Sequence, residues 1–186
     1  MNTTKNSISV NDMVYTALFA AVLCAVAPFS IRIGPIPLSF ATLVIYIAAG
    51  SLGWKYSVIS VFLYVALGAV GLPVFSGFEG GFHKIAVVTG GFIIGYFPLA
   101  LATGFAADAS KCKRLFFIAG MVVGTFMLYT LGTAWFVLQT GSTLAAALMA
   151  CVVPFLIGDT IKIVIATIAA PQLRLALAQL QSTRKR

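Results

Sequence analysis

Asp159 and Lys162 are the two residues whose types and spacing suggest chemistry in this sequence. They lie three positions apart in the apolar run from Phe155 to Ile165. On a helix, residues at this spacing share a face and can pair. Either charge alone at the centre of a bilayer costs roughly 2.5–3.5 kcal/mol. The pair predicts a polar pocket inside a membrane protein. The alternative is that the two charges only neutralise each other between helices.

The composition indicates a protein that crosses a membrane several times. Of 186 residues, 61% are apolar and 9% are charged, and the mean hydropathy is +1.06. A soluble domain usually has about 25% charged residues. The length allows about six spans of roughly 20 residues. The net charge of +8 is spread over single bases and the ends of apolar runs, as in topology signals. We therefore expect contact with membrane lipid and no nucleic-acid partner.

The stretch from Gly71 to Lys84 is rich in glycine and phenylalanine. It is too broken for a helix, so it is either an exposed loop or backbone that lines a cavity. It contains His83, the only histidine, for which no metal role is expected because no carboxylate–histidine set lies near it. No Ser/His/Asp set and no nucleotide-binding motif is visible, so we expect neither an enzyme nor a bound cofactor. Energy for any active transport must come from another subunit or an ion gradient.

Six apolar runs must position these residues in an all-α integral membrane domain that spans 1–186. Two prolines and a glycine exclude regular helix over 30–37. Residues 139–153 form either a short outer helix or the front half of the last span. Pro154 suits the first turn of a helix, and Pro171 is expected to kink or end that helix. The predicted spans are residues 13–29, 38–52, 56–70, 88–107, 115–138 and 154–170.

The first run has two further features. Ala25-Val26-Ala27 resembles a signal-peptide cleavage site, but Pro28 follows directly, so a retained span is favoured. Ala17, Ala21 and Ala25 are spaced by four and would form a flat ridge for close helix contact. This ridge is either an internal packing face or a docking face for another membrane subunit.

The distribution of basic residues predicts the orientation. With six spans, nine bases lie on the side of the two termini, against Arg32 and Lys84 on the other, and Lys162 lies within a span. This places both termini in the cytoplasm and the chain in the inner (cytoplasmic) membrane. If the last span begins at Pro154, Asp159 lies about 7–8 Å into the membrane from outside. The nine bases are Lys5, Lys55, Lys111, Lys113, Arg114, Arg174, Arg184, Lys185 and Arg186.

The expected pocket is outward-facing and would take a small, partly apolar ligand. Glycines allow close approach of backbone to a ligand, and phenylalanines provide apolar walls. Asp159 can accept N–H bonds and Lys162 can donate to oxygen. The predicted substrate-binding residues are Asp159, Lys162, Phe75, Gly80, Gly81, Thr89 and the span-2 residues Ser39, Thr42 and Tyr46.

Four segments resemble the BioY family. They are Ile36-Pro-Leu-Ser, Gly71-Leu-Pro-Val-Phe-Ser-Gly-Phe-Glu-Gly-Gly, Thr89-Gly-Gly-Phe-Ile-Ile-Gly-Tyr96 and Pro154-Phe-Leu-Ile-Gly-Asp-Thr-Ile-Lys162. BioY proteins are biotin-binding S components of energy-coupling-factor (ECF) vitamin transporters. The resemblance implies a six-helix fold, biotin near the outer side, and partnership with an energy-coupling transmembrane subunit and a pair of ATPases. It also implies that Asp159 and Lys162 contact biotin, and that Ala17, Ala21 and Ala25 dock the coupling subunit.

Biotin also fits the chemistry expected of the pocket. Its ureido ring has two N–H donors and a carbonyl acceptor, its sulfur ring is apolar, and its tail ends in a carboxylate. A second hypothesis is a self-sufficient secondary transporter of biotin or a related vitamin, coupled to protons through Asp159. A membrane-embedded enzyme is the third, and the missing catalytic set argues against it.

Overall fold

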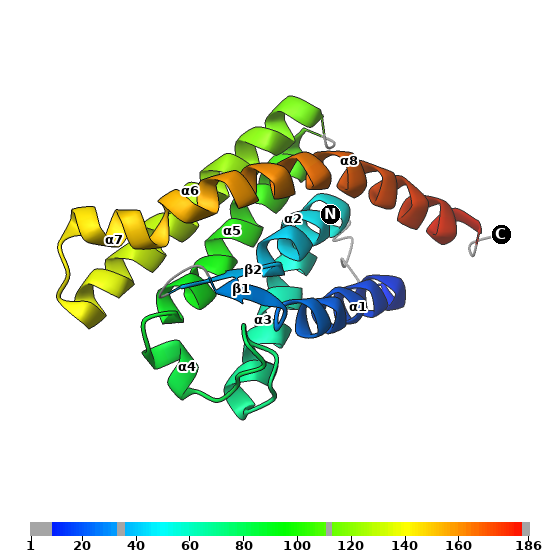
Figure 1. The fold of residues 1–186 in the computed structure, drawn as a ribbon. Coiled ribbons are helices and arrows are strands. Elements are labelled where there is room, and N and C mark those ends of the chain that lie inside the picture. The colour runs from blue at the N-terminus through cyan, green and yellow to red at the C-terminus, as the bar shows by residue number, and fades with distance from the viewer. Residues whose placement is uncertain (1–8, 33–35, 111–112, 184–186) are drawn as a thin grey trace, which may run out of the picture.

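The described part of the chain folds almost entirely into helices, with one short β-hairpin. The computed structural model describes residues 9–32, 36–110 and 113–183. The strands β1 (Ser30–Arg32) and β2 (Pro37–Ser39) pair antiparallel, with Ser30 opposite Ser39. The helices are α1 (Val10–Val26), α2 (Ala41–Leu52), α3 (Trp54–Val70), α4 (His83–Ala86), α5 (Gly90–Ala109), α6 (Arg114–Thr140), α7 (Leu144–Cys151) and α8 (Val153–Thr183) (Figure 1).

The long helices match the predicted apolar runs closely, with one exception. Each helix begins and ends within three residues of its predicted span, except at the end of α8. Pro171 does not end that helix, which continues to Thr183, because proline removes only its own N–H from the ladder. Residues Leu144–Cys151 form a separate short helix before α8. This favours a short helix within 139–153 over the alternative that these residues begin the last span.

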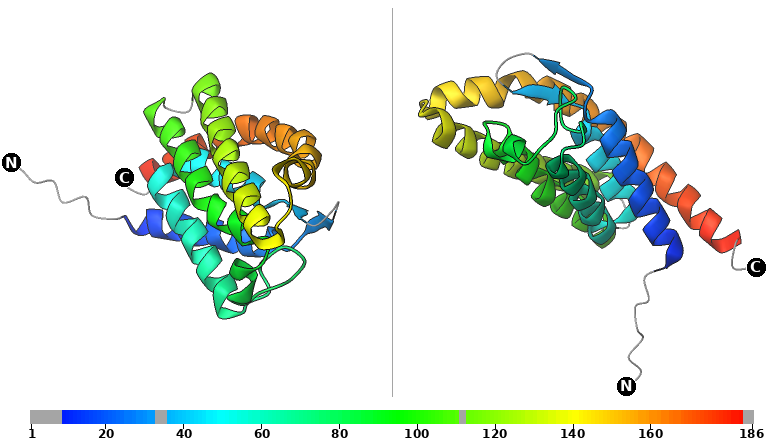
Figure 2. Two further views of the ribbon diagram at one scale, coloured as in Figure 1. Left: turned by 90° about the vertical axis from the view of Figure 1, so that its left-hand side faces the viewer. Right: turned by 90° about the horizontal axis from the view of Figure 1, so that it is seen from below.

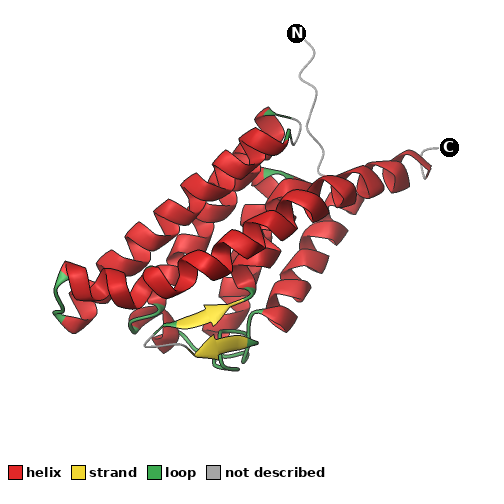
Figure 3. Ribbon diagram, turned by 45° about the horizontal axis from the view of Figure 1, so that its top comes forward, coloured by secondary structure: helices red, strands yellow, loops and turns green. Residues whose placement is uncertain are grey.

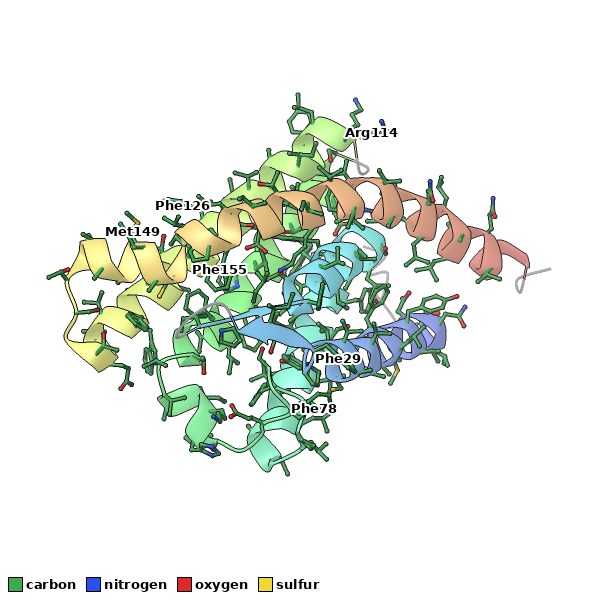
Figure 4. The ribbon with its side chains drawn as sticks, viewed as in Figure 1. Phe29, Phe78, Arg114, Phe126, Met149 and Phe155 are labelled. Carbon is green, nitrogen blue, oxygen red and sulfur yellow. The ribbon has the colours of Figure 1, made fainter. Side chains whose placement is uncertain are left out.

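Within the described residues, three helical segments are long and apolar enough to cross a membrane: Gly90–Ala109, Arg114–Thr140 and Leu144–Leu180. Three shorter apolar helices accompany them, α1, α2 and α3. The outward-facing surfaces of the helices are strongly apolar. Phe126 on α6 and Met149 on α7, for example, are 70% and 68% exposed and project away from the other helices (Figure 4).

Helix α2 lies at the centre of the bundle. It packs against α1, α3, α5 and α8, and nine of its twelve residues are buried. Figure 3 shows the long helices running alongside one another, with the hairpin and loops gathered beside them. Glycine permits its close contact with α8: a Cβ added to Gly50 would lie 2.6 Å from the Cβ of Ala170. Because α2 carries Thr42 and is enclosed by its neighbours, side chains of several helices meet around it.

The start of α1 and the end of α8 lie together at one end of the molecule (Figure 2). At this end, Arg174 of α8 bonds the carboxylate of Asp108 at 2.8 Å and the carbonyl of Ala107 at 3.2 Å. The same carboxylate accepts the backbone N–H of Trp54 at 3.1 Å. Gly53 precedes Trp54 with φ +82°, a backbone conformation that favours glycine. One ion pair thus ties α8 to α5 and to the α2–α3 turn.

The loop from Gly71 to Thr89, here called the roof loop, lies toward the opposite end. It includes α4, so the prediction that His83 and Lys84 lie outside any helix was wrong by one short turn. The backbone N–H of Gly77 donates to the carbonyl of Pro28 at 2.9 Å. The rings of Phe29 and Phe78 meet edge to face at 5.3 Å (Figure 4). The roof loop is therefore attached to the chain just beyond α1.

Candidate functional site

Asp159 and Lys162 form a buried ion pair on α8. The Nζ of Lys162 lies 2.9 Å from Oδ1 of Asp159, and the two residues are only 5% and 4% exposed. Their spacing of three puts both on the face of α8 that packs against α2. A buried charge requires a partner and further hydrogen bonds to offset its desolvation. The surrounding residues supply those bonds.

The remaining protons of Lys162 go to the segment where β2 leads into α2. Nζ donates to the carbonyl of Ser39 at 2.7 Å and to the hydroxyl of Thr42 at 3.0 Å. With Asp159, these contacts occupy all three ammonium protons. Ser39 is held in turn, because its hydroxyl donates to Ala27 O at 3.1 Å and accepts from Ala41 N at 3.0 Å. The lysine therefore fixes α8 against the start of α2.

Asp159 receives two further hydrogen bonds. The hydroxyl of Tyr129 on α6 donates to Oδ2 at 2.6 Å, and the hydroxyl of Thr42 lies 3.4 Å from Oδ1. Gly158, next to Asp159, allows the hairpin to approach α8, since an added Cβ would lie 3.3 Å from Leu38. Helices α2, α6 and α8 thus meet at one carboxylate, and the hairpin packs against α8 beside it.

Two adjoining cavities open beside the pair. The inner cavity, about 40 Å³, is lined by both charges together with Ser39, Thr42 and Tyr129. The outer cavity, about 390 Å³, lies under the roof loop and has a mostly apolar wall. Four residues line both cavities: Ile36, Pro37, Phe92 and Tyr96. Phe155 of α8, which is 7% exposed, also lines the inner cavity.

The outer cavity has the make-up of a small-molecule site. Its volume falls in the range of roughly 300–1,000 Å³ typical of ligand pockets, and aromatic rings form much of its wall. Tyr64 meets Phe75 edge to face at 5.6 Å and Tyr96 at 6.4 Å. Its polar groups include Ser76, Thr89, Glu79 and Lys84. An apolar ring with a few polar substituents would fit such a wall.

The structure brings most, not all, of the sequence-predicted residues to these cavities. Asp159, Lys162, Ser39 and Thr42 line the inner cavity, and Phe75 and Thr89 line the outer one. Tyr46 lies deeper, fully buried, with its hydroxyl 2.5 Å from that of Thr125. Gly80 and Gly81 shape the roof loop: Gly81 N donates to Gly68 O at 2.7 Å, and a side chain on Gly80 would strike the backbone of Leu72.

Several lining residues were not among the sequence-predicted set. Tyr129, Tyr96 and Phe92 are the most prominent. Tyr129 stands in a long apolar run, and nothing local marks it as facing a carboxylate thirty positions later. Tyr96 and Phe92 belong to the family-like segment that begins at Thr89, so that segment carried a signal for them.

Comparison with known proteins assigns the fold and the family. The BioY family model matches residues 1–179. The chain belongs to the BioY family. It is 34% identical to the biotin transporter BioY of Thermotoga maritima, over 88% of this chain and 95% of that protein. It is 35% identical to a probable biotin transporter BioY of Pyrococcus horikoshii, over 85% and 93%.

A solved structure supports this membership. The S-component for biotin from an ECF-type ABC transporter is similar, with a TM-score of 0.83 and 27% identity, covering 90% of this chain and 95% of that one. This BioY family chain is thus a multi-pass membrane protein with an S-component fold.

Proposed function

We propose that this chain is a high-affinity biotin-binding membrane subunit that mediates biotin uptake, energised by a separate ECF ATPase module. The observation that carries the proposal is the buried Asp159–Lys162 pair beside an aromatic cavity of about 390 Å³. Its setting is a fold similar to that of an S-component for biotin. The protein acts as a transport subunit and not as an enzyme, and it needs no cofactor of its own.

Biotin matches the two cavities in both size and polarity. The inner cavity, about 40 Å³, has room for little more than one water-sized group, so only the polar edge of the ureido ring reaches it. There Asp159 accepts a ureido N–H, and Lys162 donates to the ureido carbonyl in place of one of its present acceptors. The sulfur ring and the aliphatic tail lie against the aromatic wall of the outer cavity.

We further infer that the chain spans the inner membrane six times, with both termini in the cytoplasm. The described bases Lys55, Lys113, Arg114 and Arg174 belong to the start of α3, the start of α6 and the last part of α8, whereas Arg32 and Lys84 belong to β1 and α4. The first group of elements lies toward the end of the molecule where α1 starts, and the second lies toward the other end (Figure 1). Excess basic residues favour the cytoplasmic side. The remaining predicted cytoplasmic bases lie outside the described residues. The two cavities then open outward.

The coupling subunit would dock on α1. Ala17, Ala21 and Ala25 are all exposed along one face, whereas Ala20 is buried against the bundle. Exposure argues against the internal-packing interpretation of this ridge. Small side chains permit close contact between helices in a membrane, where apolar burial alone supplies little driving force. The paired ATP-binding subunits would act through that coupling subunit, and lipid would cover the other apolar faces.

Removing the two charges together tests the site without leaving either one unpaired. We expect Asp159→Asn/Lys162→Met to fold in detergent but to lose biotin binding by at least about 100-fold, because two charge-assisted bonds disappear at a cost of about 1.5–3 kcal/mol each. Asp12→Asn, a change at the far end of α1, serves as the control and should bind normally. Isothermal titration of purified protein measures both. Unchanged biotin affinity in the double variant would exclude the site.

A further inference from the structure

Lys84 and Glu79 form an ion pair in the wall of the outer cavity. Lys84 Nζ lies 2.5 Å from Glu79 Oε2, and their side chains are 22% and 40% exposed. Among the described residues that line this cavity, Lys84 is the one cation and Glu79 the one anion. The family-like segments did not point to either residue as a ligand contact. The pair therefore provides a second charged position, far less enclosed than the first.

The inner pair is poorly suited to receive an anion. Asp159 already places a negative charge directly beside Lys162, at 2.9 Å from its Nζ. A ligand carboxylate beside the buried Asp159 would put two like charges close together away from water, which is strongly unfavourable. A neutral donor–acceptor group causes no such repulsion. An anionic tail must therefore point toward the outer cavity.

Hydrogen bonds hold the backbone around the outer pair, and the two side chains reach partly into solvent. Phe75 N donates to Glu79 O at 2.9 Å across a short β-bridge. Lys84 N donates to Gly81 O at 3.0 Å at the start of α4. The Glu79 side chain is two-fifths exposed and can turn into water without burying its charge. Exchange of one carboxylate for another at Lys84 then requires no rearrangement of the loop.

We propose that Lys84 binds the carboxylate of the ligand, and that Glu79 holds this position while the cavity is empty. The inference rests on the proposed function and adds the orientation of the ligand: ureido ring inward, carboxylate outward. Because one carboxylate replaces another, the ammonium group has a counter-ion in both states. The ligand class is a neutral ring with donor and acceptor groups that carries a single anionic tail.

The test compares biotin with biotinamide, its neutral amide, on purified protein. Wild type should prefer biotin by about tenfold, the size of one partly exposed charge-assisted bond. Lys84→Met should weaken biotin by about tenfold and leave biotinamide unchanged, so that the preference disappears. Lys84→Arg should keep it. Glu79→Gln should tighten biotin severalfold by removing the competing carboxylate, with no effect on biotinamide.

Each alternative outcome has a distinct meaning. If Lys84→Met weakens biotin and biotinamide equally, the lysine only supports the roof loop, and the proposal is overturned. Unchanged biotin affinity in Lys84→Met overturns it as well. Biotinamide binding reports that each variant is folded, and Lys55→Met, which removes an exposed lysine near the α2–α3 turn, is the matched control. Failure of wild type to bind either ligand would refute the proposed function itself.

Discussion

At the scale of single residues, the site consists of two charges that are fully partnered before any ligand arrives. Lys162 uses all its protons, and Asp159 accepts from Lys162, Thr42 and Tyr129. The empty site is thereby held in place, since truncating any one partner leaves a buried polar group unsatisfied. In the proposed function, a ligand would therefore bind by exchange, because each bond that it forms to this pair would replace one that the protein already makes.

Tyr129→Phe should expose this dependence. It removes one donor to Asp159 Oδ2 and should lower the free energy of unfolding by about 1–2 kcal/mol, because a buried carboxylate oxygen loses its bond. Thermal unfolding in detergent without ligand measures the change. Thr130→Val is the control, since the Thr130 hydroxyl bonds Phe126 O of its own helix, and it should shift stability by less than about 0.5 kcal/mol. Equal effects of the two changes would contradict the role given to Tyr129.

Sequence reasoning found the ion pair but not Tyr129, and the difference has a physical cause. A charge in an apolar run is visible because it is costly there. A tyrosine in such a run is not, because lipid-facing and core-facing positions are both apolar and periodicity gives little sense of direction. Gly80 and Gly81 illustrate the opposite problem. The sequence shows that the loop is rich in glycine, but it does not show whether these two glycines contact a ligand or only shape the backbone.

At the scale of elements, α8 shows what anchors a long helix beyond a proline. Sequence reasoning ended the span near Ala170 because Pro171 follows. The helix continues because Arg174 lies one turn later and bonds Asp108 and Ala107 across the bundle. The helix starts could be predicted, because glycine and proline residues flank many of the apolar runs. The hairpin was not, because three-residue strands leave no periodic pattern.

Arg174→Met should loosen only the far part of α8. The ion pair is about one-third exposed, so its loss should cost no more than about 1 kcal/mol. Hydrogen exchange should rise over residues 172–183, whereas biotin affinity should stay within about twofold, because Asp159 and Lys162 lie more than two turns away. Arg114→Met, an exposed arginine at the start of α6 (Figure 4), is the control. Faster exchange around Asp159 would show that the anchor also holds the site.

At the scale of the whole molecule, binding and transport should be separable. Ala21→Phe places a bulky ring on the exposed face of α1, so we expect normal biotin affinity in the purified chain but at least about tenfold slower uptake by vesicles containing the coupling subunit and ATPases. Ala145→Phe, an exposed position on α7, should leave both unchanged. Uptake driven by a proton gradient alone, without the ATPases, would instead favour the self-sufficient transporter.

The attachment of the roof loop just beyond α1 has a mechanical consequence. The chain leaving α1 is bonded to the loop through Gly77 and Pro28, and to the site through the bond from Ser39 to Ala27 O. These two bonds, at about 0.5–1.5 kcal/mol each, couple the position of α1 to the roof loop and to Ser39. A partner that tilts α1 must either move the roof loop and Ser39 with it or break these two bonds. Either way, a movement of α1 would be transmitted to the roof loop above the outer cavity and, through Ser39, to Lys162 of the ion pair.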